Sequence, residues 1–127
     1  MRIIFATHNE DKLREIREIL REFPGEIISK KEIGEWEDAV EDGSSFLENA
    51  EIKAYDLYVR LKKKELLQDG DIIMADDSGL SIEALSFGPG IYSARFLGEN
   101  TPYPEKNKRI LEMMKEASSK SRYAYFT

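Results

Sequence analysis

Short apolar runs alternate along this chain with segments whose apolar residues recur every three or four positions. Residues 2–7 and 71–75 are mostly apolar runs of strand length. Residues 9–23 instead place apolar side chains in helical spacing, at Leu13, Ile16, Leu20 and Phe23, and Pro24-Gly25 follows them. The beginning of the chain therefore predicts a strand, a turn and a helix that ends before the Pro-Gly pair.

The middle of the chain predicts a longer helix. Ser45 and Glu48 have the spacing of a capping box, with Ser45 as the N-cap, and the helical pattern continues to about Leu67. Its apolar side consists of Phe46, Ala50, Leu57 and Leu61. Gln68-Asp69-Gly70 then predicts a turn before the strand at 71–75.

Weaker patterns fill the remaining segments. They predict a strand at 26–30, an irregular stretch at 31–43, an extended segment at 80–85, a loop at 87–92, a helix with Pro104 in its first turn and Ile110, Leu111 and Met114 on its apolar side, and a strand from Arg122. Strands that alternate with helices of this length predict an α/β fold, a mixed sheet flanked by helices. Because no repeat or linker divides the sequence, we expect residues 1–127 to form a single domain.

The composition of the chain argues against some classes of binding partner and indicates a cellular compartment. The 127 residues include 25 acidic and 19 basic side chains, a formal net charge of -6, which argues against a general binding surface for nucleic acid or acidic membrane. The chain has no cysteine, no apolar run long enough to span a bilayer and no signal-peptide pattern after Met1. We therefore expect a cytoplasmic protein without a membrane partner.

Two adjacent carboxylates, Asp76 and Asp77, follow the apolar strand at 71–75 and lead into Ser78-Gly79. Carboxylates at the mouth of a core persist when they are paired, hydrogen-bonded or bound to a metal. Mg²⁺ commonly takes one or two carboxylates together with water and substrate phosphates. The alternative is an Asx turn, in which the acid only caps the loop after the strand.

A second candidate site lies between the first strand and the first helix. Such a turn offers free backbone N–H groups and a helix dipole to an anion such as phosphate. The residues of this phosphate loop are Thr7, His8, Asn9, Glu10, Asp11 and Lys12. Lys12 would add a full positive charge, whereas Thr7 or Asn9 could equally serve as the helix N-cap.

Further polar residues could complete a phosphate and metal site. Asn49 and Lys53 are one helical turn apart and share a face that could point at a second phosphate, although an isolated lysine is more often solvated. Glu48 is explained by the capping box, so Glu41, in the loop before it, is the better spare metal ligand. His8 is the only histidine, and the sequence has no nucleophile elbow, P-loop, dinucleotide-binding motif or cysteine, which argues against those chemistries.

Three ordered motifs together resemble the Ham1/inosine triphosphate pyrophosphatase family. They are Thr7-x-Asn9-x-x-Lys12, Gly43-x-Ser45-Phe46-x-Glu48-Asn49-Ala50-x-x-Lys53-Ala54, and Ala75-Asp76-Asp77-Ser78-Gly79-Leu80 followed by Gly88-Pro89-Gly90-Ile91-Tyr92-Ser93-Ala94-Arg95. Each motif alone is weak, but their order over nearly the whole chain is specific.

The resemblance implies a Maf/Ham1-type architecture and a Mg²⁺-dependent enzyme, commonly a homodimer. The implied reaction cleaves ITP, dITP and XTP between the α and β phosphates and yields the monophosphate and pyrophosphate. The implied roles are residues 7–12 as the phosphate loop, Lys53 as a second phosphate contact, Asp77 as the base and a metal ligand, Glu41 as a further metal ligand, and Ser78 as a substrate contact.

The chain departs from the family pattern after Arg122. Members of the family continue with a Phe-Gly-Tyr-Asp segment and a Ser-His-Arg segment that contact the base, and neither occurs here. The apolar run at 123–126 therefore predicts an exposed strand and self-association. Three alternatives stay open: a nucleotide- or phosphate-binding fragment without turnover, a Maf-type nucleotide pyrophosphatase, whose phosphate loop is typically richer in serine and arginine, and an α/β domain with acids at turns.

Overall fold

The computed structural model describes residues 1–98, 100–117 and 122–127. Its backbone forms two compact units, residues 1–76 and 77–127, which are described separately. Whether the two units act as the single domain expected from the sequence stays a prediction. None of the described helices is long and apolar enough to cross a membrane.

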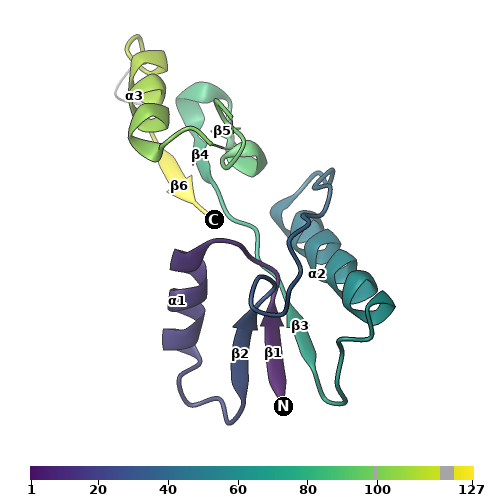
Figure 1. The fold of residues 1–127 in the computed structure, drawn as a ribbon. Helices are drawn as coiled ribbons and strands as arrows, with labels where there is room; N and C mark the ends of the chain where they lie inside the picture. The colour runs from purple at the N-terminus through teal and green to yellow at the C-terminus, as the bar shows by residue number, and fades with distance from the viewer. Residues whose placement is uncertain (99, 118–121) are drawn as a thin grey trace. The chain divides into compact units, whose positions relative to one another are not determined.

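The first unit contains a parallel three-stranded sheet (Figure 1). Its strands are β1 (Arg2–Phe5), β2 (Glu26–Ser29) and β3 (Ile72–Met74), in the order β2-β1-β3. Ile4 of the central strand is in register with Ile28 on one side and Ile73 on the other. Because the strands are parallel, the segments that follow β1 and β3 leave the sheet at the same edge.

Two helices flank this sheet in Figure 1, α1 (Glu10–Ile19) near β2 and α2 (Phe46–Lys63) near β3. The core of the unit consists of Ile4, Ala6, Leu57 and Leu61, with Ile28, Ile33, Leu67, Ile73 and Ala75 packed around them. Leu13 of α1 is also buried. The apolar spacing thus correctly identified Leu13, Leu57 and Leu61 as buried, whereas Asn49, expected on another face of α2, is buried as well.

Both helices end earlier than their apolar patterns predicted. The helix α1 ends at Ile19 rather than Phe23, and the N–H of its C-cap Leu20 donates to the Ile16 and Glu18 carbonyls. The helix α2 ends at Lys63 rather than near Leu67, and Glu65 adopts a left-handed conformation there. The turn before β3 forms as expected, and Gly70 has a positive φ of 83°.

The capping box of α2 is only partly as expected. Ser45 is the N-cap, and its hydroxyl accepts a hydrogen bond from the Glu48 N–H at 3.0 Å. The Glu48 carboxylate, however, accepts from the N–H and hydroxyl of Ser44, at 2.6 and 2.8 Å, instead of from the Ser45 N–H. Glu48 still closes the loop before the helix, one residue earlier than the motif predicts.

The second unit contains a small antiparallel sheet of β4 (Leu80–Ile82), β5 (Gly88–Pro89) and β6 (Ala124–Phe126), in the order β5-β4-β6. The 80–85 segment is extended only as far as Ile82, after which Glu83–Leu85 forms the 3-10 turn η1. The loop predicted at 87–92 is wrong in part, because it contains β5 and the 3-10 turn η2 (Gly90–Tyr92).

The helix α3 (Tyr103–Met113) covers this second sheet with Ile110 and Met114, which form a core with Ile82. Pro104 lies in its first turn as predicted, whereas Leu111 is 64% exposed and does not belong to the apolar side. The α/β class predicted from the sequence is confirmed, with the parallel and antiparallel strands in separate sheets.

Candidate functional site

The predicted phosphate loop and the first of the paired acids lie at one edge of the parallel sheet. Thr7 follows the buried end of β1, and Asp76 follows β3. A hydrogen bond of 2.8 Å from Ala6 N to the Met74 carbonyl holds the two strands together where they end. In open α/β sheets, ligands bind at this carboxyl edge of the strands.

The polar side chains of the phosphate loop first organise its own backbone. The Thr7 hydroxyl is buried and accepts a hydrogen bond from Asn9 N at 3.0 Å. Asn9 is the N-cap of α1, and its carbonyl oxygen accepts from the N–H groups of Asp11 and Lys12 at 2.9 and 3.2 Å. The capping role left open for Asn9 is therefore the one observed, and it shapes the turn in which an anion could bind.

The charged members of the loop have separate partners. His8 Nε2 lies 3.1 Å from Asp38 Oδ1, and the Asp11 carboxylate lies 2.9 Å from Arg14. The carboxylate of Glu10 lies 4.0 Å from the Lys31 ammonium.

Two lysines from different elements meet at Asp76. Lys12 Nζ of α1 lies 2.9 Å from Asp76 Oδ2, and Lys53 Nζ of α2 donates to the Asp76 main-chain carbonyl at 3.0 Å. Lys53 Nζ also lies 3.6 Å from Glu41 Oε1, and its side chain is only 20% exposed. Lys53 is therefore not a solvated surface lysine. Lys12 and Lys53 thus meet at Asp76, which sequence reasoning did not choose, and Glu41 lies beside Lys53.

Asp76 was missed because its neighbour was preferred. Both acids end the same strand, and the sequence alone gives no reason to separate their roles. What separates them is strand pairing, because Asp76 lies two residues after Met74, which is in register with Phe5 at the end of β1. Asn49 was placed near a phosphate, but it is fully buried and its amide oxygen accepts from Gly43 N at 2.8 Å.

Asp77 and Ser78 belong to the second unit, at its first residues. The Ser78 N–H donates to Asp77 Oδ1 at 3.1 Å, and Gly79 exchanges two backbone hydrogen bonds with Thr127 at 2.9 and 3.0 Å. The second carboxylate is thus held by its own loop at the start of β4. Its predicted role as a base and metal ligand stays a prediction.

Each of the paired acids has a carboxylate oxygen of the kind that a hard divalent cation takes. Asp76 Oδ1 and Asp77 Oδ2 are both withdrawn from solvent and have no hydrogen-bond partner among the described residues. Within the same part of the chain, no group of three or more acidic or histidine side chains forms a ready-made metal cage. Mg²⁺ does not need such a cage, because it is usually held by one or two carboxylates with water and substrate phosphates.

The loop after β2 is anchored by buried charges. Lys30 is 5% exposed and donates from Nζ to the Glu37 carbonyl at 2.5 Å. Glu35 is 1% exposed and accepts from Lys64 Nζ at 2.6 Å. Burial alone would raise the pKa of Glu35, but hydrogen bonds from Lys64 and from Glu37 N outweigh it and hold that pKa below its ordinary value. This loop also carries Asp38, the partner of His8.

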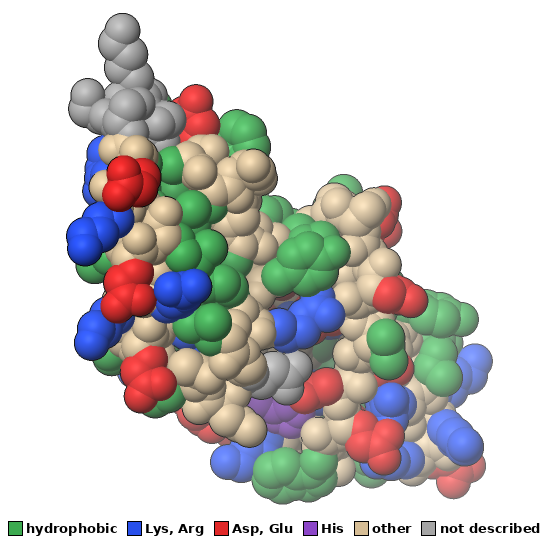
Figure 2. Space-filling model, turned by 90° about the horizontal axis from the view of Figure 1, so that it is seen from above, with side chains coloured by type: hydrophobic (Ala, Val, Ile, Leu, Met, Phe, Trp, Pro, Cys, Tyr) green, Lys and Arg blue, Asp and Glu red, His purple; other side chains and the backbone are tan. Residues whose placement is uncertain are grey.

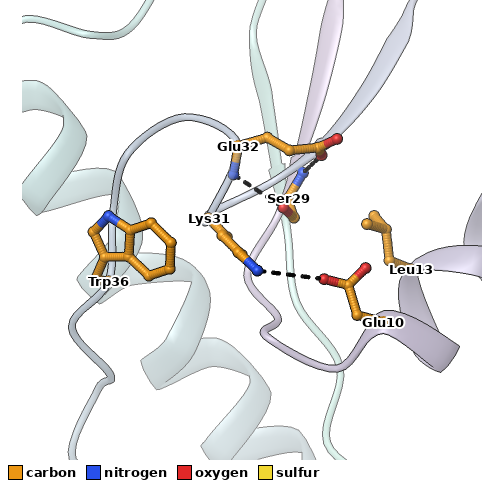
Figure 3. A pocket seen from close by; sticks show the side chains of 6 residues that line it. All are labelled: Glu10, Leu13, Ser29, Lys31, Glu32 and Trp36. Carbon is orange, nitrogen blue, oxygen red and sulfur yellow. Dashed lines mark hydrogen bonds and ion pairs between the residues drawn. The ribbon is translucent and has the colours of Figure 1, made fainter.

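A pocket of about 370 Å³ lies beside the first turn of α1, and Figure 3 shows the residues that line it. They are Glu10, Leu13, Ser29, Lys31, Glu32 and Trp36. Its polar groups largely bind one another. Ser29 N donates to the Glu32 carboxylate at 2.7 Å. This hydrogen bond is the main reason that the pKa of Glu32 lies below its ordinary value. The pocket therefore offers little unused polarity to a phosphate.

The surface carries no broad field of one sign on the face drawn in Figure 2. Basic and acidic side chains are interspersed there. This distribution agrees with the net charge of -6 and with binding of a small anion at a local site rather than a polyanion over a wide surface.

Comparisons with known proteins agree with the motifs. The family model described as Ham1 family matches residues 3–127. A dITP/XTP pyrophosphatase from Caldanaerobacter subterraneus subsp. tengcongensis is 43% identical over 126 residues, which cover 99% of this chain and 60% of that protein. A dITP/XTP pyrophosphatase from Zymomonas mobilis is also 43% identical, over 98% of this chain and 56% of its own length.

Solved structures show the same relationship. A HAM1 protein from Coxiella burnetii superimposes with a TM-score of 0.78 at 36% identity, over 99% of this chain and 59% of that protein. A nucleoside-triphosphatase, or dITP/XTP pyrophosphatase, from Mycobacterium abscessus gives a TM-score of 0.73 at 32% identity, over 99% of this chain and 62% of that protein. The chain thus spans about three fifths of the length of these relatives, and the match over residues 3–127 shows that it belongs to the Ham1 family.

Proposed function

We propose that this chain takes part in the Mg²⁺-dependent hydrolysis of non-canonical purine nucleoside triphosphates, such as ITP, dITP and XTP, to the monophosphate and pyrophosphate. The observation that carries the proposal is the meeting of Lys12 and Lys53 at Asp76, beside the phosphate loop. The names of the relatives, dITP/XTP pyrophosphatases, support the substrate class. Removal of such nucleotides from the cellular pool is the proposed purpose.

The phosphates are assigned to the first unit. A triphosphate carries several negative charges, and the two ammonium groups supply positive charge at the edge of the sheet where β1 and β3 end. Thr7, His8, Asn9, Glu10, Asp11 and Lys12 form the phosphate loop, and Lys53 is the second contact. The substrate phosphates would replace Asp76 as the partner of Lys12, which frees the Asp76 carboxylate for other contacts.

The reaction needs a water activated near the α-phosphorus. Water attacks that phosphorus, the bond from it to the bridging α–β oxygen breaks, and pyrophosphate leaves with the bond's electron pair. Asp77 is assigned as the base that takes the proton of the water, and Ser78 as a contact to the substrate. Position and charge, rather than a covalent intermediate, carry the proposed catalysis.

The cofactor is assigned to the carboxylates. Glu41 and Asp77 would hold Mg²⁺, with Asp76 as a further oxygen ligand. When bound, Mg²⁺ neutralises phosphate charge and helps to orient the substrate. The solvent-shielded oxygens of Asp76 and Asp77, which have no hydrogen-bond partner in the described part of the chain, support this assignment.

The test is pyrophosphate release from ITP, dITP and XTP, with ATP for comparison, in the presence of Mg²⁺ and again with EDTA. Turnover that needs Mg²⁺ and prefers the non-canonical purines is the expected result. Binding of ITP in calorimetry without pyrophosphate release would overturn the catalytic proposal and leave a nucleotide-binding protein. Equal turnover of ATP and ITP would overturn the proposed substrate class.

Two further properties are part of the proposal. The resemblance to the family suggests a homodimer, and the absence of cysteine from the sequence agrees with a cytoplasmic location. Light scattering after size-exclusion chromatography tests the first, since a mass of one chain at all concentrations would contradict it. Fractionation of the source cells tests the second.

A further inference from the structure

We propose that Asn49 is a positioning residue that fixes the segment from Glu41 to Gly43 against α2, and so sets Glu41 for the metal. The inference rests on the proposed function, in which Glu41 is a Mg²⁺ ligand. The residues that carry it all belong to the first unit.

Asn49 is an unusual residue for its place. It lies in the second turn of α2 and is 0% exposed, although asparagine is a poor helix former and buried polar groups require partners. Its Oδ1 accepts a hydrogen bond of 2.8 Å from Gly43 N, which lies outside the helix. The buried amide thus ties the preceding loop to the helix.

Gly43 is fitted to this bond. A Cβ at residue 43 would lie 2.6 Å from Asn49 Oδ1 and 2.8 Å from Glu48 Cβ, closer than real Cβ atoms come to either. Only a glycine therefore allows the loop backbone to approach the amide closely enough for the hydrogen bond. The hydrogen bond thus needs both the amide side chain of Asn49 and the absence of a side chain at Gly43.

The same face of α2 also contacts the Glu41 carboxylate in the preceding loop. Lys53 follows Asn49 by one helical turn, and its ammonium lies 3.6 Å from Glu41 Oε1. The helix therefore touches the loop at its backbone through Asn49 and at its carboxylate through Lys53. Lys53 also binds the Asp76 carbonyl at 3.0 Å, so the position of Glu41 is set relative to the chain that leads into the paired acids.

Stability alone does not account for an amide here. Asn49 Nδ2 is buried and has no hydrogen-bond partner among the described residues. An unsatisfied buried donor is unfavourable, and an apolar residue such as leucine in the same place would avoid that penalty and favour the helix. An apolar residue could not supply the hydrogen bond to Gly43. Substitution of residues that orient a metal ligand typically lowers metal affinity 10- to 100-fold.

Two variants break the bond from opposite sides. Asn49→Leu removes the acceptor and keeps the branched shape of the side chain, and Gly43→Ala introduces the overlapping Cβ. Asn49→Asp keeps an acceptor for Gly43 N and is the conservative variant. Leu57→Ala is the matched control, because Leu57 is 1% exposed on the same helix and belongs to the core instead of the loop contact.

Three measurements are made on each variant of the 127-residue chain. They are hydrogen exchange of the Gly43 amide, Mn²⁺ binding by electron paramagnetic resonance in the presence of α,β-methylene ITP, and the Mg²⁺ dependence of pyrophosphate release. Asn49→Leu and Gly43→Ala are expected to speed exchange at Gly43 and to weaken Mn²⁺ binding about tenfold or more, whereas Asn49→Asp stays within about threefold of wild type. Leu57→Ala is expected to lower Tm without weakening Mn²⁺ binding.

Unchanged Mn²⁺ binding in both Asn49→Leu and Gly43→Ala, with Gly43 exchange accelerated, would overturn the positioning role. Unchanged exchange at Gly43 would overturn it as well, since the hydrogen bond would then not hold the loop. Failure of the proposed function looks different: the wild-type chain would bind Mn²⁺ with the analogue but release no pyrophosphate. In that case the shift in Mn²⁺ binding alone decides the role of Asn49.

Discussion

The ammonium of Lys12 lies 2.9 Å from a carboxylate oxygen of Asp76, across the edge of the parallel sheet. The two side chains come from α1 and from the segment after β3, which are more than 60 residues apart in the chain. Both are partly exposed, at 25% and 38%, so the pair contributes little to stability and can exchange partners. A lysine held in this way is available to an incoming phosphate.

Replacement of Lys12 tests its phosphate role. Lys12→Gln is expected to raise KM for ITP roughly 10- to 100-fold, because a hydrogen bond to a charged group contributes about 1.5–3 kcal/mol. The measurement is steady-state pyrophosphate release, with the free energy of unfolding as a check on folding. Arg14→Gln is the control, since Arg14 lies on the same helix and its side chain is 75% exposed. Equal effects of the two substitutions would show that only general charge matters.

Substitution by asparagine distinguishes the roles of the two adjacent acids, Asp76 and Asp77. Asp77→Asn is expected to lower kcat by about 10²- to 10⁴-fold while nucleotide binding is retained, as for loss of a general base. Asp76→Asn is expected to change KM more than kcat, because the Asp76 carboxylate pairs with Lys12, the proposed phosphate contact. Single-turnover kinetics and calorimetry separate the two effects. Full turnover by Asp77→Asn would exclude it as the base.

Local signals in the sequence predicted most of the first unit. The N-cap role of Ser45 depends only on its own hydroxyl and on the N–H of Glu48 three residues later, so the sequence alone predicts it. The end of α2 did not follow, because its last turn is closed by hydrogen bonds from Glu65 N to the Lys62 carbonyl and from Leu66 N to the Leu61 carbonyl, both 3.0–3.1 Å. This closure usually has a glycine where Glu65 stands, and no glycine marked it.

The site was predictable in its parts but not in its contacts. Loop and helix motifs drew attention to Lys12 and Lys53 separately, whereas their common partner depends on strand order. The sequence does not reveal that β1 and β3 are neighbours, and hence did not favour Asp76 over Asp77. Similarly, periodicity could place Asn49 on a polar face but could not show that Gly43 packs against it.

Acid is expected to weaken the first unit through Asp71. Arg2 binds its carboxylate with two hydrogen bonds, of 3.0 and 2.6 Å, and this contact lowers the pKa of Asp71 despite burial. A lowered folded-state pKa gives stability that is present above the unfolded value, about 3.9, and is lost as pH falls through the folded value. Asp71→Asn should therefore cost roughly 1–3 kcal/mol at pH 7 and progressively less below about pH 4.

Urea unfolding of wild type and Asp71→Asn between about pH 2.5 and 7 measures this difference, because that range extends to both sides of the pKa of an ordinary carboxyl, about 3.9. Asp69→Asn is the control, because it removes an exposed acid from the same turn. A constant difference between wild type and Asp71→Asn across this range would mean that the ion pair with Arg2 does not contribute to stability.

Self-association is expected at β6. This strand is at the edge of the β5-β4-β6 sheet, and its side chains are exposed, with Phe126 at 72%. An exposed apolar edge strand offers unpaired backbone groups and apolar area to a second chain, and a lysine on such an edge opposes pairing. Phe126→Lys is therefore expected to lower the average mass measured by light scattering at high protein concentration.

The matched control is Tyr55→Lys, since Tyr55 is 70% exposed on α2 and the substitution adds the same charge without touching an edge strand. If both variants lower the mass equally, added charge rather than the strand edge is responsible. If neither does and the mass stays at two chains, association uses another surface, as the proposed homodimer would. A single-chain mass for wild type at every concentration would exclude both forms of association, because an edge that stays unpaired at high concentration does not bind its own copy.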